Sequence, residues 1–298
     1  MLKKDKRKSE KLQYSNNVEQ IVDNLTLFDD DLMSMVFDEN IPATELLLKI
    51  ILKRDDIEVV SVVGQKELEN TIVGGRNIRL DILARGWNGK YYNVEVQRSN
   101  DGADERRARF HSSMIDSRML KEGQEFKELR DSYVVFITQK DYFGYGLPIY
   151  TINRHLEERR VRFKDGSHII YVNGSYRGND PIGMLMEDFA CKDSEDMHYA
   201  ELADGVRHFK EEGGRYFMCQ AVEEYAARVA AEAAAKARAE AKAEAKAEVD
   251  DAIVKASIED AISYGVSKKR IIVKVCDKYG LSREEAGRLY DSYATMTK

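Results

Sequence analysis

The sequence lacks three features that mark common classes of protein. Its cysteines are few and far apart, at Cys191, Cys219 and Cys276, and form no CxxC pair, so neither a disulfide framework nor a zinc site is indicated. No run approaches about 18 apolar residues, and the basic, polar stretch from Met1 to Lys11 has no apolar core. We therefore expect no membrane span, no secretion signal and a reduced, cytoplasmic environment.

A strong excess of positive charge is also missing. The chain has 47 Lys and Arg against 53 Asp and Glu, a net charge of −6. This balance excludes a protein coated by nucleic acid over its whole surface, although a local basic patch could still bind phosphates. The chain does have 43% hydrophobic residues in 298, which predicts one full-sized core with an appendage, or two domains.

Apolar periodicity predicts helices first, then strands and helices in alternation. Pro42 suits the start of a helix. The expected elements are helices over residues 25–37, 43–52 and 105–120, a hairpin over 78–97, and strands over 59–63, 133–138 and 168–172. This order predicts an α/β or α+β fold with helices packed on a mixed sheet.

The second half of the chain reads as helical. After a helix over residues 201–220, residues 221–248 include 14 alanines among 28 positions, enough for a helix of about 42 Å. Charges circle this helix without an apolar stripe, which favours a solvated spacer over a coiled coil. We expect a charged N-terminus over 1–20, a core domain over 21–200, a helical linker over 201–249 and a small helical module over 250–298, with Ser267 and Ser282 as helix N-caps.

Two acids fall on facing strands of the predicted hairpin. If residues 87–89 form a three-residue loop, with Gly89 in the left-handed conformation, Asp81 lies directly opposite Glu95. Opposed carboxylates repel one another unless a cation lies between them, and Mg²⁺ prefers such ligands. A two-residue loop would shift the register by one and separate the acids, leaving ordinary surface residues.

Gln97 and a group of arginines accompany the two acids. Gln97 lies two residues beyond Glu95 and therefore points to the same side. The basic residues follow on or beside the predicted helix over 105–120, where they could bind phosphates next to a metal. They are Arg98, Arg106, Arg107 and Arg109.

Taken together, these segments resemble the PD-(D/E)XK nuclease family transposases and recombination-promoting nucleases of bacteria. The resemblance extends over about residues 25 to 200. The segments that carry it are Asp30-Asp31-Leu32-Met33 with Val36-Phe37, Arg79-Leu80-Asp81, Tyr92-Asn93-Val94-Glu95-Val96-Gln97, Arg107-Ala108-Arg109-Phe110-His111, Ser132-Tyr133-Val134-Val135-Phe136-Ile137 and Phe143-Gly144-Tyr145-Gly146-Leu147-Pro148.

The resemblance implies a restriction-endonuclease-like core with Asp81, Glu95 and Gln97 at its metal-binding edge. Gln97 stands where the wider superfamily usually has lysine. A further acid from the first helix is expected in the metal shell, with Glu45 favoured and Asp31 behind it. His111 replaces one of a pair of tyrosines common in the family, and we expect it to pack or to lie at the surface rather than to act on a phosphate.

The function that follows is a Mg²⁺-dependent DNA endonuclease, with Mn²⁺ as a substitute, that promotes recombination or belongs to a mobile element. DNA is the expected partner, and the C-terminal helices could form a homodimer. Two alternatives stay open: a catalytically inactive DNA-binding or assembly protein of the same fold, and, ranked last, an RNA-cleaving toxin.

Overall fold

A computed structural model describes residues 17–70, 72 and 74–294 of the chain. The charged lead expected over residues 1–20 therefore lies mostly outside the described residues. The chain divides into two compact units, the first ending at Glu224 and the second beginning at Tyr225. None of the helices within the described residues is long and apolar enough to cross a membrane.

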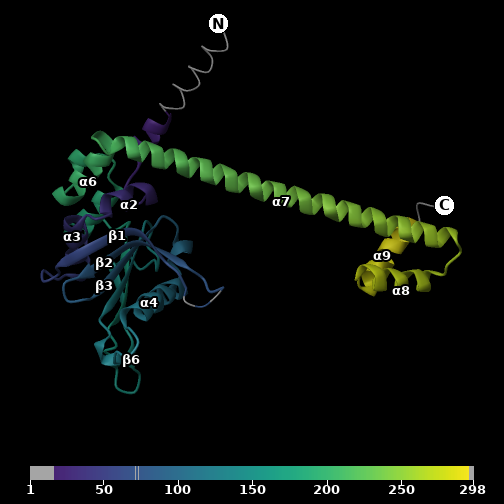
Figure 1. Ribbon diagram of the computed structural model, residues 1–298, viewed down its shortest axis with the longest axis horizontal. Coiled ribbons are helices and arrows are strands. Elements are labelled where there is room, and N and C mark those ends of the chain that lie inside the picture. Colours follow the sequence, from purple (N-terminus) through teal and green to yellow (C-terminus); the bar gives the residue numbers. More distant parts are fainter. Residues whose placement is uncertain (1–16, 71, 73, 295–298) are drawn as a thin grey trace, which may run out of the picture. The chain divides into compact units, whose positions relative to one another are not determined.

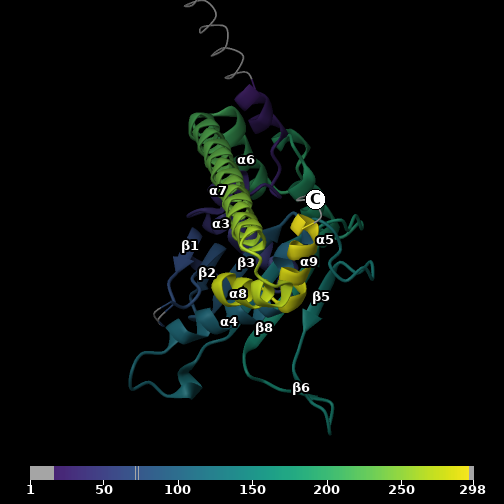
Figure 2. The same ribbon diagram turned by 90° about the vertical axis from the view of Figure 1, so that its right-hand side faces the viewer.

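The first unit is built on a mixed six-stranded sheet in the order β1-β2-β3-β4-β8-β5. Strands β1, β2 and β3 are antiparallel, β4 runs parallel to both β3 and β8, and β5 returns antiparallel to β8. Figure 2 shows this order from β1 on the left to β5 on the right. The strands are β1 (Val59–Leu68), β2 (Ile78–Gly86), β3 (Tyr91–Gln97), β4 (Ser132–Thr138), β5 (Ile149–Ile152) and β8 (Ser167–Asn173), with a separate ribbon of β6 (His155–Leu156) and β7 (Val161–Arg162).

Each face of the sheet has its own apolar core, because neighbouring residues of a strand point to opposite faces. In β4 every residue is buried: Val135 and Ile137 pack into the larger core, whereas Val134 and Phe136 pack into the smaller one under α4 (Glu105–Met119). The larger core is covered by α2 (Asp30–Phe37), α3 (Ile41–Leu52), α5 (Pro181–Ala190) and α6 (Ala200–Glu211) (Figure 1). The expected mixed sheet with helices on both faces is confirmed.

Local chemistry explains where the first helices begin. α2 starts at Asp30 rather than at Leu25, because Asp29 accepts hydrogen bonds from the backbone and hydroxyl of Thr26 and closes a turn there. α3 has Asn40 as its N-cap, accepting from the backbone N–H of Ala43, with a proline in its first turn. The expected helix start at Pro42 is confirmed to within one residue.

The helix expected over residues 201–220 is two helices. α6 ends at Glu211, and α7 (Arg215–Ser263) begins after Gly213 and Gly214, since glycine is a poor helix former. Met218 and Val222, in the first turns of α7, pack into the larger core with α6. The first unit therefore extends past residue 200, where we expected the core to end. Shorter 3₁₀ segments are η1 (Asn100–Ala103), η2 (Phe126–Glu128) and η3 (Ser194–Asp196).

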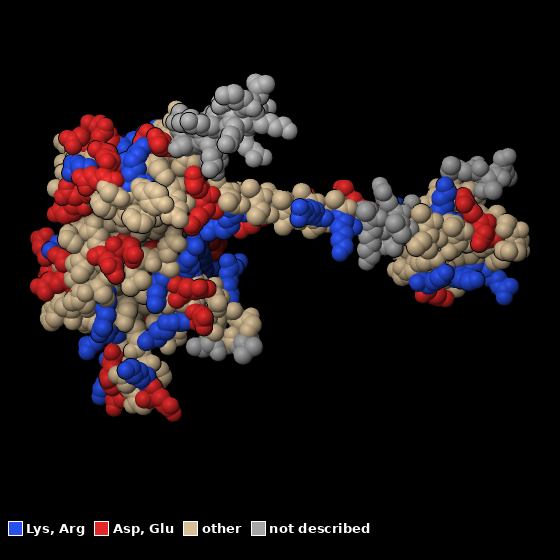
Figure 3. All heavy atoms as spheres, turned by 45° about the horizontal axis from the view of Figure 1, so that its top comes forward, with Lys and Arg blue, Asp and Glu red and all other residues tan. Residues whose placement is uncertain are grey.

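The second unit contains α7 from Tyr225 onward. The end of α7 packs with α8 (Lys268–Tyr279) and α9 (Arg283–Ala294) around a small apolar core that includes Ile258 and Ile271. The Ser282 hydroxyl accepts from the backbone N–H of Glu285, and the Glu285 carboxylate accepts from that of Ser282, a capping box that confirms Ser282 as an N-cap. Lysine and arginine side chains gather along one edge of this unit (Figure 3).

Candidate functional site

The β2–β3 hairpin has the three-residue loop that the sequence predicts. Its backbone pairs run from Arg85 with Tyr91 to Ile82 with Val94. Gly89 has φ of 78°, in the left-handed region where glycine is favoured, and the Gly86 N–H donates to the carbonyl of Lys90. The alternative two-residue loop is excluded, and the next residues in this register are Asp81 and Glu95.

Backbone pairing between the two strands ends at this acid pair, and hydrogen bonds from backbone N–H groups to the two carboxylates replace it. The Asp81 N–H donates to Glu95 Oε1 at 3.3 Å, and the Val96 N–H donates to Asp81 Oδ2 at 3.0 Å. Each acid is therefore held by the backbone of the opposite strand. Glu95 is fully buried and Asp81 is 7% exposed, so the two carboxylates lie side by side out of bulk water.

A twist in the sheet coincides with Asp81. Residues two apart on a regular strand share one face, yet Leu80 packs in the core under α4 and Ile82 packs in the opposite core. On the neighbouring strand β1, Gln65 has φ of 47°, a conformation that L-residues rarely adopt. The strands thus twist at the level of the acid pair, where the backbone pairing of β2 with β3 ends.

Burial and like charge both act on Asp81. Burial, and after it the neighbouring charge of Glu95, raise the pKa of its carboxyl to about 8. Glu95 has the compensating partners: Arg107 Nη2 lies 3.0 Å from Oε2, and His111 Nδ1 lies 3.4 Å from Oε1. Without an added cation, Asp81 therefore holds a proton at neutral pH while Glu95 is paired with an arginine.

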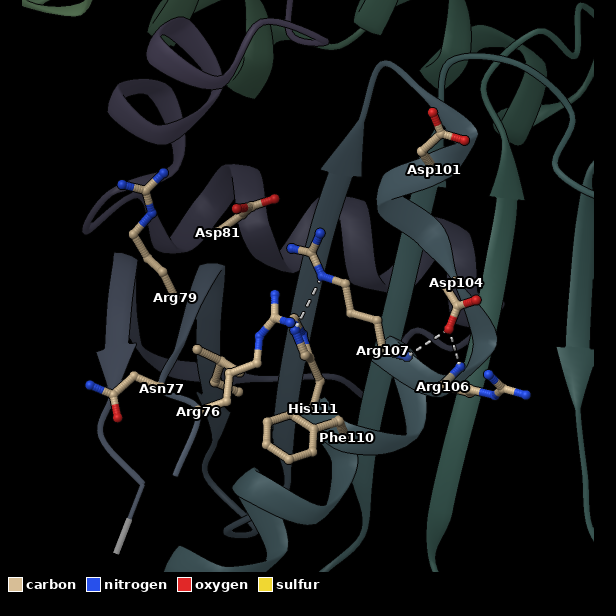
Figure 4. Close-up of a pocket in the computed structure, with 11 residues that line it drawn as sticks. Arg76, Asn77, Arg79, Asp81, Asp101, Asp104, Arg106, Arg107, Phe110 and His111 are labelled. Carbon is tan, nitrogen blue, oxygen red and sulfur yellow. Dashed lines mark hydrogen bonds between the residues drawn. The ribbon is translucent and has the colours of Figure 1, made fainter. Parts of the chain in front are cut away.

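Asp81 opens into a cavity of about 670 Å³ between β2 and the start of α4. Four arginines line this cavity, against three aspartates. Figure 4 shows the guanidinium groups of Arg76, Arg79 and Arg107 near Asp81, whereas that of Arg106 points away. A polyanion could approach the acid pair past these cations.

The arginines predicted to bind DNA have different surroundings. Arg107 reaches the acid pair, and Arg106 is an exposed residue at the cavity wall. Arg109 is exposed but does not line the cavity, and Arg98 forms an ion pair of 2.5 Å with Asp29. Only Arg107 is thus brought into contact with a predicted metal ligand.

Gln97 ends β3, on the same side as Glu95, but its amide turns toward η1. A Cβ added at Gly102 would lie 1.9 Å from Gln97 Oε1, so the side chain packs directly on this glycine. Gln97 does not line the cavity around Asp81. Its predicted place at the metal-binding edge, beside Asp81 and Glu95, remains a proposal.

Glu45 is not brought to the acid pair. Its carboxylate accepts from Lys49 Nζ at 2.7 Å and from the backbone N–H of Val59 at 3.0 Å. Val59 pairs with Gly86, five residues along β2 from Asp81, or about 17 Å at the rise of a strand. Glu45 fixes α3 to the far end of β1, which corrects the expectation that it completes the metal shell.

The acid of the first helix whose charge reaches the pair is Asp30, one residue before the expected Asp31. The charge of Asp30 contributes to the raised pKa of Asp81. Asp30 also lies 3.5 Å from Arg79 at the cavity wall. Both aspartates stand in the first turn of α2, and the sequence offered no means of choosing between adjacent acids.

Two buried polar residues lie behind Glu95, and sequence reasoning missed one of them, Asn93. His111 is 2% exposed, which agrees with the expectation that it packs, and Asn93 is fully buried. Asn93 Nδ2 lies 3.3 Å from His111 Nδ1. The available signal was a polar residue two positions before Glu95 in an otherwise apolar strand, because such residues share a face.

Comparison with known families accords with this geometry. Residues 36–173 match the family described as PD-(D/E)XK nuclease family transposase. This part of the chain is therefore similar to that family. The matched range contains the whole β2–β3 hairpin and α4, and the mixed sheet flanked by helices is the restriction-endonuclease-like fold expected for the family. No curated protein matches the chain, and no solved structure does.

The donor set of this nuclease-like domain fits a hard divalent cation. Asp81 and Glu95 supply adjacent carboxylates whose repulsion a cation would remove. Among the residues that the structure describes, no group of three or more His, Cys, Asp and Glu is arranged to hold a metal ion. A cation at the pair would therefore complete its shell with water, backbone carbonyl or substrate oxygens, as Mg²⁺ commonly does.

Proposed function

We propose that this protein is a divalent-metal-dependent endonuclease that hydrolyses phosphodiester bonds of DNA, with Mg²⁺ as its metal and Mn²⁺ as a substitute. The observation that carries the proposal is the buried pair of Asp81 and Glu95, at the point where the backbone pairing of β2 with β3 ends, beside a cavity lined by arginines. Carboxylates bind hard cations and arginines bind phosphates. Similarity to the nuclease family supports the same reaction.

The acidic and basic residues of the site have different proposed roles. Asp81 and Glu95 would hold the cation, which when bound polarises a phosphate oxygen and lowers the pKa of water. Asp81 Oδ2 already accepts from Val96 and Glu95 Oε2 from Arg107, so both carboxylates are fixed before substrate arrives. Arg98, Arg106 and Arg109 provide exposed positive charge for the DNA backbone. The products would carry a 5′-phosphate and a 3′-hydroxyl.

The test is nicking of supercoiled plasmid with Mg²⁺ by wild type and Asp81→Ala. Asp101→Ala is a matched control, because Asp101 is an exposed aspartate that lines the same cavity without contacting the pair. Loss of nicking in Asp81→Ala alone supports the assignment. Equal nicking by all three proteins would defeat it.

A DNA-binding protein without catalysis is the second candidate. It is favoured by Gln97 in the place of a lysine and by the lack of a third acid at the pair among the described residues. It predicts binding that weakens with salt, needs no metal and survives loss of both acids. Metal-independent binding without nicking by wild type would select this candidate.

The biological setting remains a proposal of the same kind. Strand cleavage by this domain would promote recombination or serve a mobile element, in keeping with the transposase description of the family. Homodimerisation through the C-terminal helices and a cytoplasmic location also stay predictions. Sedimentation of the full chain tests the first, since a dimer doubles the mass.

A further inference from the structure

Arg107 holds the only guanidinium that contacts the acid pair among the described residues. It lies in the first turn of α4, whose N-cap Asp104 accepts from the backbone N–H groups of Arg106 and Arg107. From there its side chain reaches across to β3, where Nη2 donates to Glu95 Oε2 at 3.0 Å. The positive charge of Arg107, on α4, therefore lies beside β3, whose own residue Gln97 is uncharged.

Three hydrogen bonds, one from each nitrogen of the guanidinium, hold the Arg107 side chain in place. Besides the bond to Glu95, Nη1 donates to the carbonyl of Gly102 at 3.0 Å, and Nε donates to His111 Nε2 at 3.3 Å. Gly102 is also the residue on which Gln97 packs. Both the Arg107 guanidinium and the Gln97 amide therefore contact Gly102.

His111 is itself held so that it can accept from Arg107. Because Nε2 accepts the Nε–H, the ring proton lies on Nδ1, which faces Glu95 Oε1 and the amide of Asn93. Asn93 Oδ1 is buried without a hydrogen-bond partner among the described residues. The O and N of this amide are assigned from their surroundings, and with the two exchanged Oδ1 accepts from the Nδ1–H. A buried chain from Asn93 through His111 therefore supports the guanidinium.

The arginine still has donors to offer. A guanidinium carries five N–H groups, and the three contacts above use one each. The side chain is 37% exposed and lines the cavity with Asp81. Its two remaining N–H groups are therefore available to a ligand in that cavity, and a phosphate with two free oxygens matches them.

We infer that Arg107 is a catalytic residue: its guanidinium, held by Glu95, Gly102 and His111, binds the scissile phosphate and supplies the positive charge that Gln97 cannot. This inference rests on the proposed nuclease function. During hydrolysis a water molecule gives up a proton and its oxygen bonds to phosphorus, while the P–O3′ bond breaks, its electron pair leaves with O3′, and O3′ takes up a proton from solvent. The guanidinium stays charged throughout and stabilises the negative charge that grows on the phosphate oxygens.

This role differs from that of the neighbouring arginines. Arg106 is an exposed arginine at the same cavity, but its guanidinium points away from that of Arg107 (Figure 4). Arg106 can contribute a backbone contact, which raises affinity for all DNA alike. Arg107 is fixed next to the acids, so its contribution belongs to the chemical step.

The experiment compares Arg107→Ala, Arg107→Lys and the matched control Arg106→Ala in the full chain. Three quantities are measured: single-turnover cleavage of duplex DNA with Mg²⁺, DNA affinity with Ca²⁺ in place of Mg²⁺, and Mn²⁺ affinity by calorimetry without DNA. For Arg107→Ala we expect cleavage to fall at least about 100-fold, the loss typical of a missing oxyanion donor. Its DNA affinity should stay within about threefold of that of Arg106→Ala, since each removes one phosphate contact.

Mn²⁺ affinity separates a catalytic role from structural support. Removal of a cation from Glu95 should leave Mn²⁺ binding unchanged or tighter, and Arg107→Lys should recover part of the cleavage because it keeps the charge. Cleavage by Arg107→Ala within about threefold of Arg106→Ala would overturn the inference, as would loss of Mn²⁺ binding in step with cleavage. A wild type that binds DNA and Mn²⁺ without cutting refutes the proposed function itself, and the catalytic role with it.

Discussion

Replacing Asp81 by asparagine should stabilise the metal-free protein at alkaline pH, although it removes a proposed metal ligand. Burial and then the charge of Glu95 raise the pKa of Asp81 to about 8. At that pH the folded state must hold a second negative charge beside Glu95. Asparagine has no charge, and its Oδ1 can still accept from the Val96 N–H, which Asp81 Oδ2 does in the wild type.

The size of the effect follows from proton linkage. Below the ordinary pKa of 3.8, Asp81 is protonated in both states and contributes no difference. Between 3.8 and about 8 the folded protein keeps a proton that the unfolded chain has lost, so the free energy of unfolding falls by about 1.4 kcal/mol per pH unit. The accumulated cost at pH 8 is about 5 kcal/mol, and burying the asparagine NH₂ costs about 1 kcal/mol. We expect Asp81→Asn to be about 4 kcal/mol more stable at pH 8 and nearly equal to wild type at pH 4.

The assay is urea unfolding in chelator at pH 4 to 8.5, followed by the fluorescence of Trp87. This residue is the single tryptophan of the chain and lies in the β2–β3 turn, so it reports on the first unit alone. Glu95→Gln is the matched control and should destabilise, because it leaves Arg107 and His111 without their carboxylate. Parallel stability curves for wild type and Asp81→Asn across this pH range would refute the reasoning.

Three further predictions concern the same unit. Mn²⁺ should raise the melting temperature more at pH 8 than at pH 6, because below pH 8 it must displace the proton of Asp81; an equal shift at both pH values in differential scanning fluorimetry would contradict this. Gly89→Ala should cost about 1 kcal/mol in urea unfolding because φ is positive, whereas Gly213→Ala, at a position with open space and no positive φ, should be neutral. Lys210→Met should cost about 2 to 4 kcal/mol, because the buried ammonium donates to the carbonyls of Asp23, Leu25 and Lys192; an unchanged urea midpoint would show these bonds to be weak.

Local sequence signals accounted for five strands of the main sheet, although not for β5. Alternating apolar residues and a three-residue loop ending in Gly89 place Asp81 opposite Glu95, and the structure selects this loop over the two-residue alternative. The Ser282 capping box is local in the same way. By contrast, the helix expected from Leu25 to Phe37 starts later, since Asp29 closes a turn that hydropathy does not reveal.

The choice among acids required the tertiary structure. Glu45 and Asp30 both lie on early helices, and each is polar in an amphipathic pattern. The packing of α3 on the start of β1 pairs Glu45 with Lys49 and Val59, whereas the start of α2 brings the charge of Asp30 to the acid pair. Contacts between residues many positions apart depend on how elements dock, and periodicity carries no information about docking.

The sequence by itself showed the resemblance to the nuclease family and predicted the mixed sheet, and it offered the hairpin register that opposes Asp81 and Glu95 as one of two. Only the tertiary structure decided that α4 turns Arg107 and His111 onto Glu95, that both acids are buried, and that Gln97 faces Gly102 instead of the cavity. The physical reason is that burial and long-range charge set the pKa of Asp81 and the orientation of Arg107. Both arise only when β3 and α4 pack face to face.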